Sequence, residues 1–388
     1  MGYADEQNEI YRRGTTGQRP KRPIDWRVLE SQASQQLRPG PWGYIAGSAG
    51  REETNDANRT ALSRVQIVPR MLRDVSTRNL ERTVLGTRFP APVFLSPIGV
   101  QTLAHPEGEL ASARAAASLG IPFTASTAGS HTLEAIAEAA GAAPRWYQLY
   151  WPKSRDLAAS FIQRAEAAGY SALVVTLDTW LLGWRPRDLT EAFLPFLWGE
   201  GNINYFTDPV FRSKLERSPE DDPAGAIALF VREFSNPTVT WDDLEWLREQ
   251  TSLPIVLKGI QHVDDARRAV DAGVESVFVS NHGGRQVDGA IGSLDALREI
   301  SKAVGDQTEL LFDSGIRGGA DAVKALSLGA RAVGIGRPFI WGLAVGGSDG
   351  VRDVIAHLLA ELDLTLALTG HADIDELDAS AVKLSDAH

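Results

Sequence analysis

The segment Val277-Phe278-Val279-Ser280-Asn281-His282-Gly283-Gly284-Arg285-Gln286 joins an apolar, β-type run to a polar cluster. In that cluster His282 could act as a base, Arg285 carries a fixed positive charge, and two glycines would let the backbone approach a ligand closely. Such a change from apolar to polar residues is typical of a strand whose end faces an active site. The segment therefore predicts a buried strand followed by functional side chains.

Seven further segments have the same character, and Ala-rich helical patterns alternate with them. This alternation is the signature of βα units and a parallel sheet. The eight predicted strands are residues 93–96, 123–126, 146–150, 172–177, 255–258, 276–280, 310–313 and 332–336. The helices predicted between them include residues 108–119, 156–168, 263–272, 294–304 and 320–328. Eight βα units imply an α/β fold of the (β/α)8 TIM-barrel type, with the active site at the C-terminal ends of the strands.

Two regions fall outside the βα repeat. Residues 1–85 form an N-terminal extension: a polar arm over residues 1–30 that packs on the body or on a neighbouring subunit, and helices over residues 26–37 and 58–62. About 75 residues separate the fourth and fifth strands, more than a βα unit needs. This insertion predicts a lid over residues 181–240, and an oligomer contact is the alternative. The whole chain, residues 1–388, is expected to form one domain.

The composition is that of a globular protein, with 43% hydrophobic and 23% charged residues. A formal net charge of −11 argues against nucleic acid and anionic membranes as partners, because both demand basic surface. The absence of cysteine excludes disulfides, thiolate metal sites and a cysteine nucleophile, and it fits a reducing compartment. No apolar signal segment and no 18-residue apolar run is present, so the chain is predicted to be cytoplasmic.

Polar side chains stand at nearly every predicted strand end. Buried polar groups cost free energy unless they are partnered, so stability alone does not explain this concentration. It is expected if the strand ends form an active site. The side chains concerned are Ser96, Ser126, Gln148, Tyr150, Thr176, Asp178, Lys258, Ser280, His282, Arg285, Asp313 and Arg337.

The loops after the last two strands, residues 313–319 and 334–338, each combine glycine with an arginine. Gly315 and Arg317 belong to the first loop, Gly336 and Arg337 belong to the second, and each loop leads toward a helix N-terminus. Backbone N–H groups and the helix dipole hold phosphates at this position of a barrel. The two loops therefore predict a phosphate site. The alternative is tight-turn glycines with arginines in surface ion pairs.

His282 can accept a proton near neutral pH, and Asp178 stands at another strand end. A carboxylate that is hydrogen-bonded to an imidazole orients the ring and raises its basicity, so these two residues predict a general base. Arg285 and Arg185 offer forked donors suited to a substrate carboxylate. A histidine with a purely structural role is the competing interpretation.

Lys258 ends an apolar strand, so its ammonium group should point into the mouth of the barrel. There it could form a Schiff base, pair with a carboxylate, or stabilise negative charge that develops on a cofactor. The residues alone leave these three roles open.

No cluster of histidines or carboxylates has the spacing of a metal site, so no metal is predicted. A Gly-x-Ser-x-Gly elbow, a Walker-type loop and a Rossmann fingerprint at the first strand are also absent from the sequence. Trp151, Trp180 and Trp184 are expected to pack within the insertion or, in one case, to line the pocket.

Residues 280–286 resemble the active-site motif of the FMN-dependent 2-hydroxy-acid oxidase and dehydrogenase family, and the similarity extends in order from Tyr44 to Trp341. Within this family, residues 8–11, 69–72, 177–180, 183–189 and 258–262 are similar to lactate 2-monooxygenase. The resemblance implies FMN as cofactor and a small 2-hydroxy acid and O2 as substrates. It also implies a homo-oligomer, either a tetramer or an octamer, with neither nucleic acid nor membrane as a partner.

Carried over residue by residue, the resemblance makes His282 the base, Asp178 its partner and Tyr150 a donor to the substrate oxygen. Tyr44 and Arg285 would bind the substrate carboxylate, with help from Arg185. The residues implied for FMN are Pro97, Ile98 and Gly99 by backbone contact; Ser126, Gln148 and Thr176 along the isoalloxazine; Lys258 and Ser280 near its N1 edge; Asp313 on the ribityl chain; and Gly315, Arg317, Gly336 and Arg337 at the phosphate.

Two positions depart from the usual pattern of the family. Gly99 stands where relatives often have alanine, and glycine beside the reactive edge of the flavin is similar to the monooxygenases. Ala128 stands where relatives carry a larger apolar or aromatic residue, so a smaller wall could admit a longer or aromatic substrate.

The reaction that the resemblance implies is oxidation of an L-2-hydroxy acid, lactate or a close analogue, with O2. Oxidative decarboxylation of the bound keto acid would follow, giving acetate, carbon dioxide and water from lactate. One alternative is an oxidase that releases keto acid and hydrogen peroxide, on lactate or on a larger acid such as mandelate. The others are a dehydrogenase with another electron acceptor, an FMN-dependent isomerase and a non-catalytic flavin-binding protein.

Overall fold

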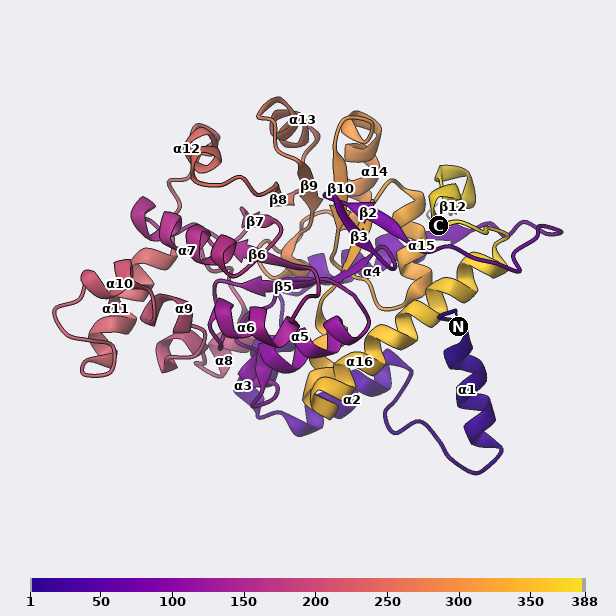
Figure 1. Ribbon diagram of the computed structural model, residues 1–388, viewed down its shortest axis with the longest axis horizontal. Coiled ribbons are helices and arrows are strands. Elements are labelled where there is room, and N and C mark those ends of the chain that lie inside the picture. The colour runs from indigo at the N-terminus through magenta and orange to yellow at the C-terminus, as the bar shows by residue number, and fades with distance from the viewer. Residues whose placement is uncertain (1, 386–388) are drawn as a thin grey trace.

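The computed structural model describes residues 2–385, and at its centre eight parallel strands form a closed barrel (Figure 1). The strands are β4 (Val93–Leu95), β5 (Phe123–Ser126), β6 (Arg145–Leu149), β7 (Leu173–Thr176), β8 (Ile255–Ile260), β9 (Ser276–Val279), β10 (Glu309–Phe312) and β11 (Ala332–Ile335). They follow one another around the barrel in chain order, and β11 pairs with β4 to close it. The predicted (β/α)8 TIM barrel is confirmed, and each predicted strand overlaps an observed one.

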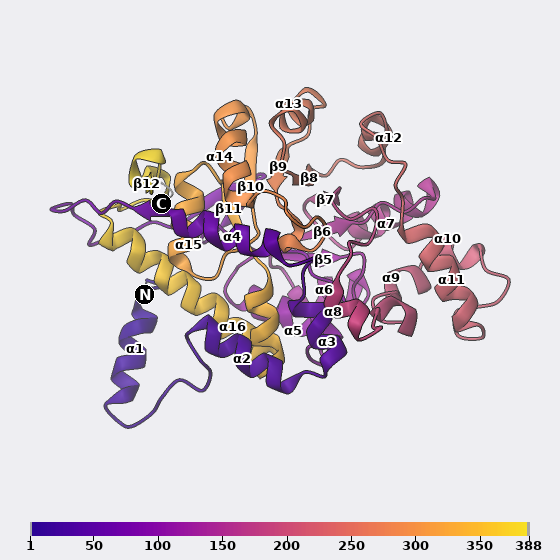
Figure 2. The ribbon, with the colours of Figure 1, turned by 180° about the vertical axis from the view of Figure 1, so that it is seen from behind.

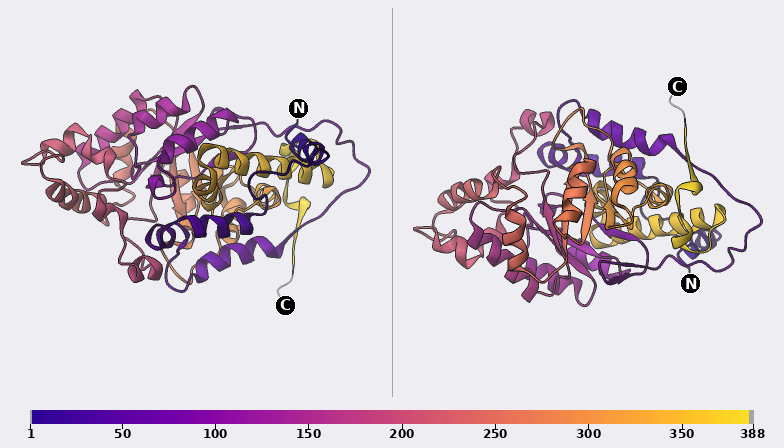
Figure 3. Two further views of the ribbon diagram at one scale, coloured as in Figure 1. Left: turned by 90° about the horizontal axis from the view of Figure 1, so that it is seen from below. Right: turned by 90° about the horizontal axis from the view of Figure 1, so that it is seen from above.

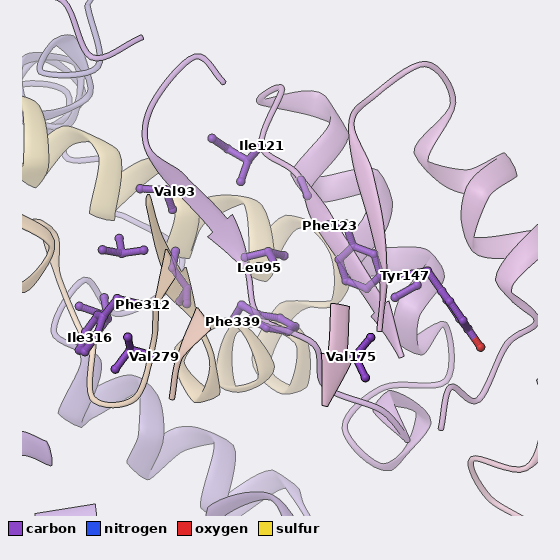
Figure 4. Close-up of a cluster of buried hydrophobic side chains, with 14 of the residues drawn as sticks. Val93, Leu95, Ile121, Phe123, Tyr147, Val175, Val279, Phe312, Ile316 and Phe339 are labelled. Carbon is purple, nitrogen blue, oxygen red and sulfur yellow. The ribbon is translucent and has the colours of Figure 1, made fainter. Parts of the chain in front are cut away.

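Alternate residues along the strands face two apolar cores. Phe94, Trp146 and Phe278 belong to the core inside the barrel and are completely buried. Leu95 and Phe123 face the layer between the barrel and its helices, part of which Figure 4 shows. Burial on both faces explains why these strands read as apolar runs rather than as alternating patterns.

Helices follow the strands and cover the barrel. They are α5 (Gly108–Ser118), α6 (Leu133–Ala140), α7 (Arg155–Ala167), α13 (Val263–Asp271), α14 (Ser293–Val304), α15 (Gly319–Ser327) and α16 (Arg337–Leu368). The five helices predicted between strands are confirmed, with both ends of each within one residue. Helix α16 is kinked at Gly346 and Gly347. Within residues 2–385, no helix combines the length and apolar character needed to cross a membrane.

The N-terminal extension contains four helices: α1 (Asp5–Gly14), α2 (Trp26–Gln36), α3 (Pro39–Ala46) and α4 (Glu53–Arg64). The two predicted helices are confirmed as α2 and α4. The apolar segment after Pro41 is also helical, because Pro39 suits the first turn of a helix and starts α3 there. Helix α2 runs beside α16 (Figures 1 and 2), where Leu29 and Ala33 pack with Trp341.

Two small antiparallel sheets complete the fold. Strand β2 (Arg82–Val84) pairs with β3 (Thr87–Phe89), and β1 (Val65–Ile67) pairs with β12 (Val382–Leu384). Val84 and Phe89 join the inner core, so the β2–β3 hairpin closes the N-terminal end of the barrel. The C-terminal end of the barrel, where the polar residues lie, is not covered by this hairpin. Short 3-10 helices lie at Gln101–Leu103, Pro195–Trp198, His282–Gly284, Ile374–Glu376 and Ala379–Ala381.

The insertion between β7 and β8 folds into α8 (Pro186–Thr190), α9 (Ile203–Phe206), α10 (Pro209–Ser213), α11 (Pro223–Phe234) and α12 (Asp243–Gln250). Its helices α9–α11 lie at the end of the molecule opposite α1 (Figures 1 and 3). Asn204, which is fully buried, accepts a hydrogen bond from the backbone N–H of Leu133 (2.9 Å) and donates one to the carbonyl of Thr127 (3.1 Å). The insertion is therefore anchored to the barrel at α9.

Candidate functional site

A cavity opens at the C-terminal ends of the barrel strands, where this fold places active sites. Counted with its opening to solvent, it has a volume of about 1180 Å³, which exceeds the space that a small substrate alone would fill. The sequence-predicted residues that line it are Tyr44, Ser96, Pro97, Ile98, Gly99, Ala128, Tyr150, Arg185, Lys258, His282, Arg285, Asp313, Gly315, Arg317, Gly336 and Arg337. The structure therefore brings residues from the extension, the insertion and most strand ends to one place.

His282 and Asp178 form a hydrogen-bonded pair at the edge of this cavity. The Nδ1 atom of His282 lies 2.9 Å from Oδ1 of Asp178 and 3.1 Å from Oγ1 of Thr179. Thr179 also donates to Oδ1 of Asp178 at 2.8 Å. Because Nδ1 faces a carboxylate, we assign the ring proton to Nδ1, which leaves Nε2 free to accept a proton. Two side chains from separate strand ends are thus in contact in the arrangement of a general base.

The backbone around His282 adopts an uncommon conformation. The φ angles of His282, Gly283 and Gly284 are 55°, 67° and 75°, in a region that costs a non-glycine residue of order 1 kcal/mol or more. The side chain of Asn281 accepts from the N–H of Gly284 (3.1 Å), and Oγ of Ser280 accepts from the N–H of His282 (3.1 Å). These bonds hold the turn that aims His282 at the cavity.

Lys258 projects from β8 toward the same carboxylate. Its Nζ atom lies 3.1 Å from Oγ of Ser280 and 3.5 Å from Oδ2 of Asp178. Strand β8 is irregular here, and a Cβ atom at Gly259 would lie 2.8 Å from Cβ of Asp178. Glycine at this position therefore lets β8 approach Asp178 closely enough for the ion pair.

These charged groups set one another's protonation. Burial alone would raise the pKa of Asp178, but the charges of Lys258 and His282 outweigh it and hold that pKa below its usual range. Burial alone would lower the pKa of Lys258, but Asp178 and Asp313 outweigh it and raise that pKa. Burial lowers the pKa of His282, and the charge of Lys258 adds to the effect. At neutral pH the imidazole is therefore neutral and Lys258 is protonated, which disfavours a Schiff base at Lys258.

Two guanidinium groups face the cavity from neighbouring loops. Arg285 donates through Nη1 to the carbonyl oxygens of Tyr44 (2.6 Å) and Gly47 (2.7 Å). Arg185 is 4% exposed and donates to the carbonyl of Arg285 (2.9 Å) and to Oε1 of Gln286 (2.6 Å). Burial and the charge of Arg285 lower the pKa of Arg185 to about 10, so it remains charged at neutral pH. Two cations this close together favour an anionic ligand such as a carboxylate.

The end of the cavity at α16 is also cationic. Arg337 donates to the carbonyl oxygens of Gly283 (3.0 Å) and Gly47 (3.1 Å). Arg317 has a buried Nε atom without a hydrogen-bond partner among residues 2–385. Gly336 precedes the N-terminus of α16, and a Cβ atom built on it would meet open space. Two arginines, a helix N-terminus and free space beside them fit the phosphate group of FMN.

Asp313 connects this end of the cavity to the base. Its Oδ1 atom accepts from Oγ of Ser280 (2.6 Å) and its Oδ2 atom accepts from Oγ of Ser96 (2.9 Å). Because Ser280 also contacts Lys258, hydrogen bonds and ion pairs link Asp313 through Lys258 to Asp178. The side chains at the ends of β8, β9 and β10 therefore hold one another in place.

Four residues that the resemblance assigned to FMN do not line this cavity. One is Ser280, which bonds to Lys258 and Asp313 as described above. The others are Ser126, Gln148 and Thr176. Oγ of Ser126 donates to Oε1 of Gln148 (2.5 Å), and Nε2 of Gln148 donates to Oγ1 of Thr176 (2.7 Å). The three side chains form a buried, hydrogen-bonded row across the ends of β5, β6 and β7. A role for this row in holding FMN stays a prediction.

One side of the cavity is aromatic. The ring of Phe234 lies with its centroid 5.0 Å from that of Tyr150 and 5.4 Å from that of Phe196. Ala128 contributes only a methyl group to the lining. A Cβ atom at Gly99 would lie 2.3 Å from the carbonyl oxygen of Ala128, so the loops after β4 and β5 pack too closely for a side chain there.

The expectation that three tryptophans pack within the insertion or line the pocket is right only for Trp151. Trp151 is 7% exposed and its ring centroid lies 5.7 Å from that of Trp246. Trp180 and Trp184 are 46% and 73% exposed, and neither lines the cavity described above. The segment that carries Trp180 and Trp184 runs over the surface, so the prediction that these two side chains are packed was wrong.

Several residues of the site were not predicted from the sequence. Asp188 lies near Arg185, with Oδ2 3.9 Å from Nη1, and burial raises the pKa of its carboxyl. Asp188 follows Arg185 by three residues, a spacing that could have pointed to it. Thr179 could have been inferred from its place next to the strand end. The positions of Phe196 and Phe234 in the cavity lining could not be predicted, because the sequence of the insertion does not show where its chain runs.

Comparisons with known proteins point to one family. The model of the family described as FMN-dependent dehydrogenase matches residues 33–384. The L-lactate oxidase of Lysinibacillus sphaericus is 44% identical over 92% of this chain and 91% of its own, and the 4-hydroxymandelate oxidase of Amycolatopsis orientalis is 43% identical over 87% and 92%. A crystal structure of mandelate oxidase with (S)-4-hydroxymandelic acid superposes with a TM-score of 0.82 at 40% identity, covering 94% of this chain and all of that one.

Proposed function

The chain belongs to the FMN-dependent dehydrogenase family, and on that premise we propose that it oxidises an L-2-hydroxy acid with O2 and retains the keto acid for oxidative decarboxylation. FMN is its cofactor, and the chain is an FMN-dependent 2-hydroxy-acid oxidoreductase. One observation carries the proposed oxidation: the hydrogen-bonded pair of His282 and Asp178 lies at the edge of the cavity that Arg285 and Arg185 also line. A base beside a carboxylate-binding pair of cations is what removal of hydrogen from a 2-hydroxy acid requires.

The substrate carboxylate binds to the guanidinium of Arg285, with Arg185 behind it and the phenol of Tyr44 alongside. The carbonyl oxygens of Tyr44 and Gly47 hold Arg285 in place, so its orientation does not depend on the substrate. Tyr150 donates a hydrogen bond to the substrate hydroxyl oxygen, and burial raises the pKa of its phenol, which keeps it protonated. These contacts fix Cα of the substrate beside the base.

Nε2 of His282 takes the proton from the substrate hydroxyl group. The ionised carboxylate of Asp178 stabilises the imidazolium that results and keeps Nδ1 protonated. FMN, when bound, supplies the acceptor for the two electrons that leave Cα. Lys258 adds a permanent positive charge at this point of the cavity, where negative charge develops.

The phosphate end of FMN is proposed to lie at Arg317, Arg337 and the N-terminus of α16. Gly315 and Gly336 leave the backbone accessible there, and Asp313 offers an acceptor for a ribityl hydroxyl. Pro97, Ile98 and Gly99 also line the cavity and are proposed to contact FMN through their backbone.

Retention of the keto acid is proposed to depend on the insertion. Leu182, Phe196 and Phe234 bring apolar groups from it to the cavity, and Oε2 of Glu200 accepts a hydrogen bond from Thr102 at 2.9 Å. O2 takes up the two electrons and two protons removed from the substrate and becomes hydrogen peroxide. If the keto acid stays bound, the peroxide adds to its carbonyl carbon, the bond from that carbon to the carboxylate breaks, and carbon dioxide and water leave with the shortened acid. Lactate and O2 then give acetate, carbon dioxide and water.

A panel of L-2-hydroxy acids tests this proposal, with O2 uptake, hydrogen peroxide, keto acid and carbon dioxide measured together. One carbon dioxide per O2 and no free peroxide is the expected result. Equal yields of keto acid and peroxide would show instead an oxidase that releases both. Flavin reduction without O2 consumption would indicate a dehydrogenase with another acceptor. An isomerase or a non-catalytic flavoprotein would show no substrate-dependent O2 uptake.

A second candidate is an oxidase that acts on an aromatic 2-hydroxy acid and releases keto acid and hydrogen peroxide. The observation that favours it is that the small Ala128 side chain lines the same cavity as Tyr150, Phe196 and Phe234, which leaves room beside an aromatic wall. One relative named above carries 4-hydroxymandelate in its name. The panel separates this candidate from the first, because mandelate and lactate are both in it.

Replacing Ala128 by phenylalanine is expected to lower kcat/KM for mandelate about 10- to 100-fold, with a smaller effect on lactate, because the new ring fills the space beside Phe234. The ratio of the two kcat/KM values is the measurement, and lactate serves as the internal control for folding and FMN content. An unchanged ratio would mean that Ala128 does not form the wall for the substrate side chain.

The pH dependence of flavin reduction follows from the lowered pKa of His282. The neutral imidazole is the active form, so the rate of flavin reduction is highest above this pKa and falls as the pH drops below it. Because burial lowers the pKa, the acidic limb of kcat/KM is expected below the ordinary value of 6.5. In Asp178→Asn the loss of a charge that raises this pKa should move the limb down by about one pH unit or more. A limb that moves upward would contradict the pairing.

Three further proposals come from the sequence. We propose that the protein is a homo-oligomer, either a tetramer or an octamer, that it is cytoplasmic, and that residues 1–388 fold as one domain. The exposed apolar side chains of Trp184 and Trp198, at 73% and 74%, support the first of these, because subunit contacts would cover them. Sedimentation analysis of the holoenzyme measures the oligomer.

A further inference from the structure

Arg317 differs from the arginines around it in how its charge is balanced. Arg59 forms an ion pair with Oδ2 of Asp321 at 2.7 Å. Arg337 donates to several oxygen atoms, among them Oγ of Ser48 at 2.8 Å. The backbone N–H of Arg317 donates to Oδ2 of Asp321 (3.0 Å), but its guanidinium makes one hydrogen bond, from Nη1 to the carbonyl of Ile316 (3.0 Å), and no ion pair within residues 2–385. Something other than hydrogen bonds must therefore hold its guanidinium.

Two tryptophan rings provide that contact. The guanidinium carbon of Arg317 lies 5.5 Å from the ring centroid of Trp26 and 5.2 Å from that of Trp341. The two rings are stacked, with centroids 6.2 Å apart and planes inclined by 17°. A cation within about 6 Å of an indole face is attracted by the ring electrons. Arg27 and Arg59 approach the ring of Trp26 as well, at 4.5 and 5.9 Å.

We propose that Trp26, from the N-terminal extension, is a positioning residue for the cofactor phosphate: with Trp341 it holds the guanidinium of Arg317 toward the phosphate of FMN. The proposal rests on the assignment of the phosphate to Arg317 and Arg337 made above. It extends the cofactor site to helix α2, which does not line the cavity.

The chemistry of the site explains why an aromatic contact suits this position. A carboxylate partner would neutralise Arg317 and occupy its N–H donors, so it would compete with the phosphate. An indole face stabilises the same cation and leaves the donors free. Burial, together with the charge of Arg59, lowers the pKa of Arg317 to about 10, and the opposing charges of Glu30 and Asp321 do not offset this shift. The bound phosphate would supply that missing charge.

The sequence around Trp26 fixes its position at the start of helix α2. Asp25 caps the N-terminus of α2 by accepting from the N–H of Arg27 at 2.7 Å, so Trp26 is the first residue of the helix. Further along α2, Leu29 and Ala33 pack in the same cluster as Trp341. Helix α2 is therefore fixed against α16 (Figures 1 and 2), whose N-terminus carries Arg337.

The test compares the binding of FMN and riboflavin to the full chain after FMN has been removed. Riboflavin lacks the phosphate, so it reports the rest of the flavin site. Trp26→Leu is expected to weaken FMN binding about tenfold and to leave riboflavin binding unchanged, because the loss falls on the phosphate contact alone. Trp26→Phe, which keeps an aromatic face, should restore most of the FMN affinity. The measurement is quenching of flavin fluorescence during titration.

Trp246→Leu is the matched control, because the guanidinium carbon of Arg155 lies 5.2 Å from the ring centroid of Trp246, and Trp246 does not line the cavity. The FMN affinity of this variant should equal that of the natural chain. For a variant that does not survive removal of FMN, the rate of FMN release from the diluted holoenzyme gives the same comparison. Equal losses of FMN and riboflavin in Trp26→Leu, or no loss, would overturn the proposal. The phosphate assignment itself is checked by Arg317→Met, in which equal losses for both flavins would contradict that assignment.

Discussion

Replacing His282 by glutamine is expected to slow reduction of the bound flavin by an L-2-hydroxy acid about 10²- to 10⁴-fold, which is the usual contribution of a general base. Glutamine can still donate a hydrogen bond toward Asp178, but its amide cannot accept the hydroxyl proton at neutral pH. The measurement is the rate at which the yellow colour bleaches after anaerobic mixing of the holoenzyme with substrate.

FMN content separates this loss from loss of cofactor. The hydrogen bonds of the His282 ring go to Asp178 and Thr179, so the variant should retain FMN with an unchanged visible spectrum. His262→Gln is the matched control, because His262 is exposed at the start of α13 and should bleach normally when it is replaced. Bleaching of His282→Gln at the natural rate would remove His282 from the role of base.

Replacing Arg285 by methionine is expected to lower kcat/KM for the 2-hydroxy acid about 100-fold or more. Hydrogen bonds to a charged group contribute about 1.5–3 kcal/mol each, and the variant loses the forked donor that meets the carboxylate. The effect should appear mainly as weaker substrate binding. The natural enzyme should prefer a 2-hydroxy acid over its carboxamide, and the variant should lose most of that preference.

The acid-to-amide ratio is a safer measure than activity alone, because Arg285 also holds the carbonyl oxygens of Tyr44 and Gly47. A general loosening of α3 would lower both rates and leave their ratio unchanged. Arg298→Met, at a position on α14 that does not line the cavity, should change neither rate. A variant at position 285 that kept the natural ratio would show that the carboxylate binds elsewhere.

The barrel could be predicted because its strands are buried on both faces, so that each strand is a short apolar run that can be recognised from a few residues. Short apolar runs such as residues 276–279 end at polar side chains, and the helices between them have regular spacing. The same rule located His282, Lys258 and Arg337, since the fold gathers all strand ends at one face. These three residues could therefore be placed at the cavity without any knowledge of the loops.

The parts that could not be predicted depend on long-range packing. Nothing in the sequence places Trp26 beside Arg317, or Asn58 beside Asn281, whose amides exchange hydrogen bonds of 2.9 and 2.7 Å. The irregularity at Gly259, which lets Asp178 reach Lys258, is equally hidden, because a single glycine in an apolar run has several meanings. Exposure of Trp184 was missed because an indole normally reads as a core residue.

The cavity that holds His282, Arg285 and Lys258 is proposed to remove hydrogen from Cα of an L-2-hydroxy acid, with two electrons passing to FMN. Anaerobic titration of the natural holoenzyme tests it most directly, with the L and D forms of lactate and mandelate added separately. Complete bleaching by one equivalent of an L acid per FMN, with one keto acid formed and no reaction with the D acids, is the predicted result. A flavin that stays oxidised with all four acids would contradict this proposal.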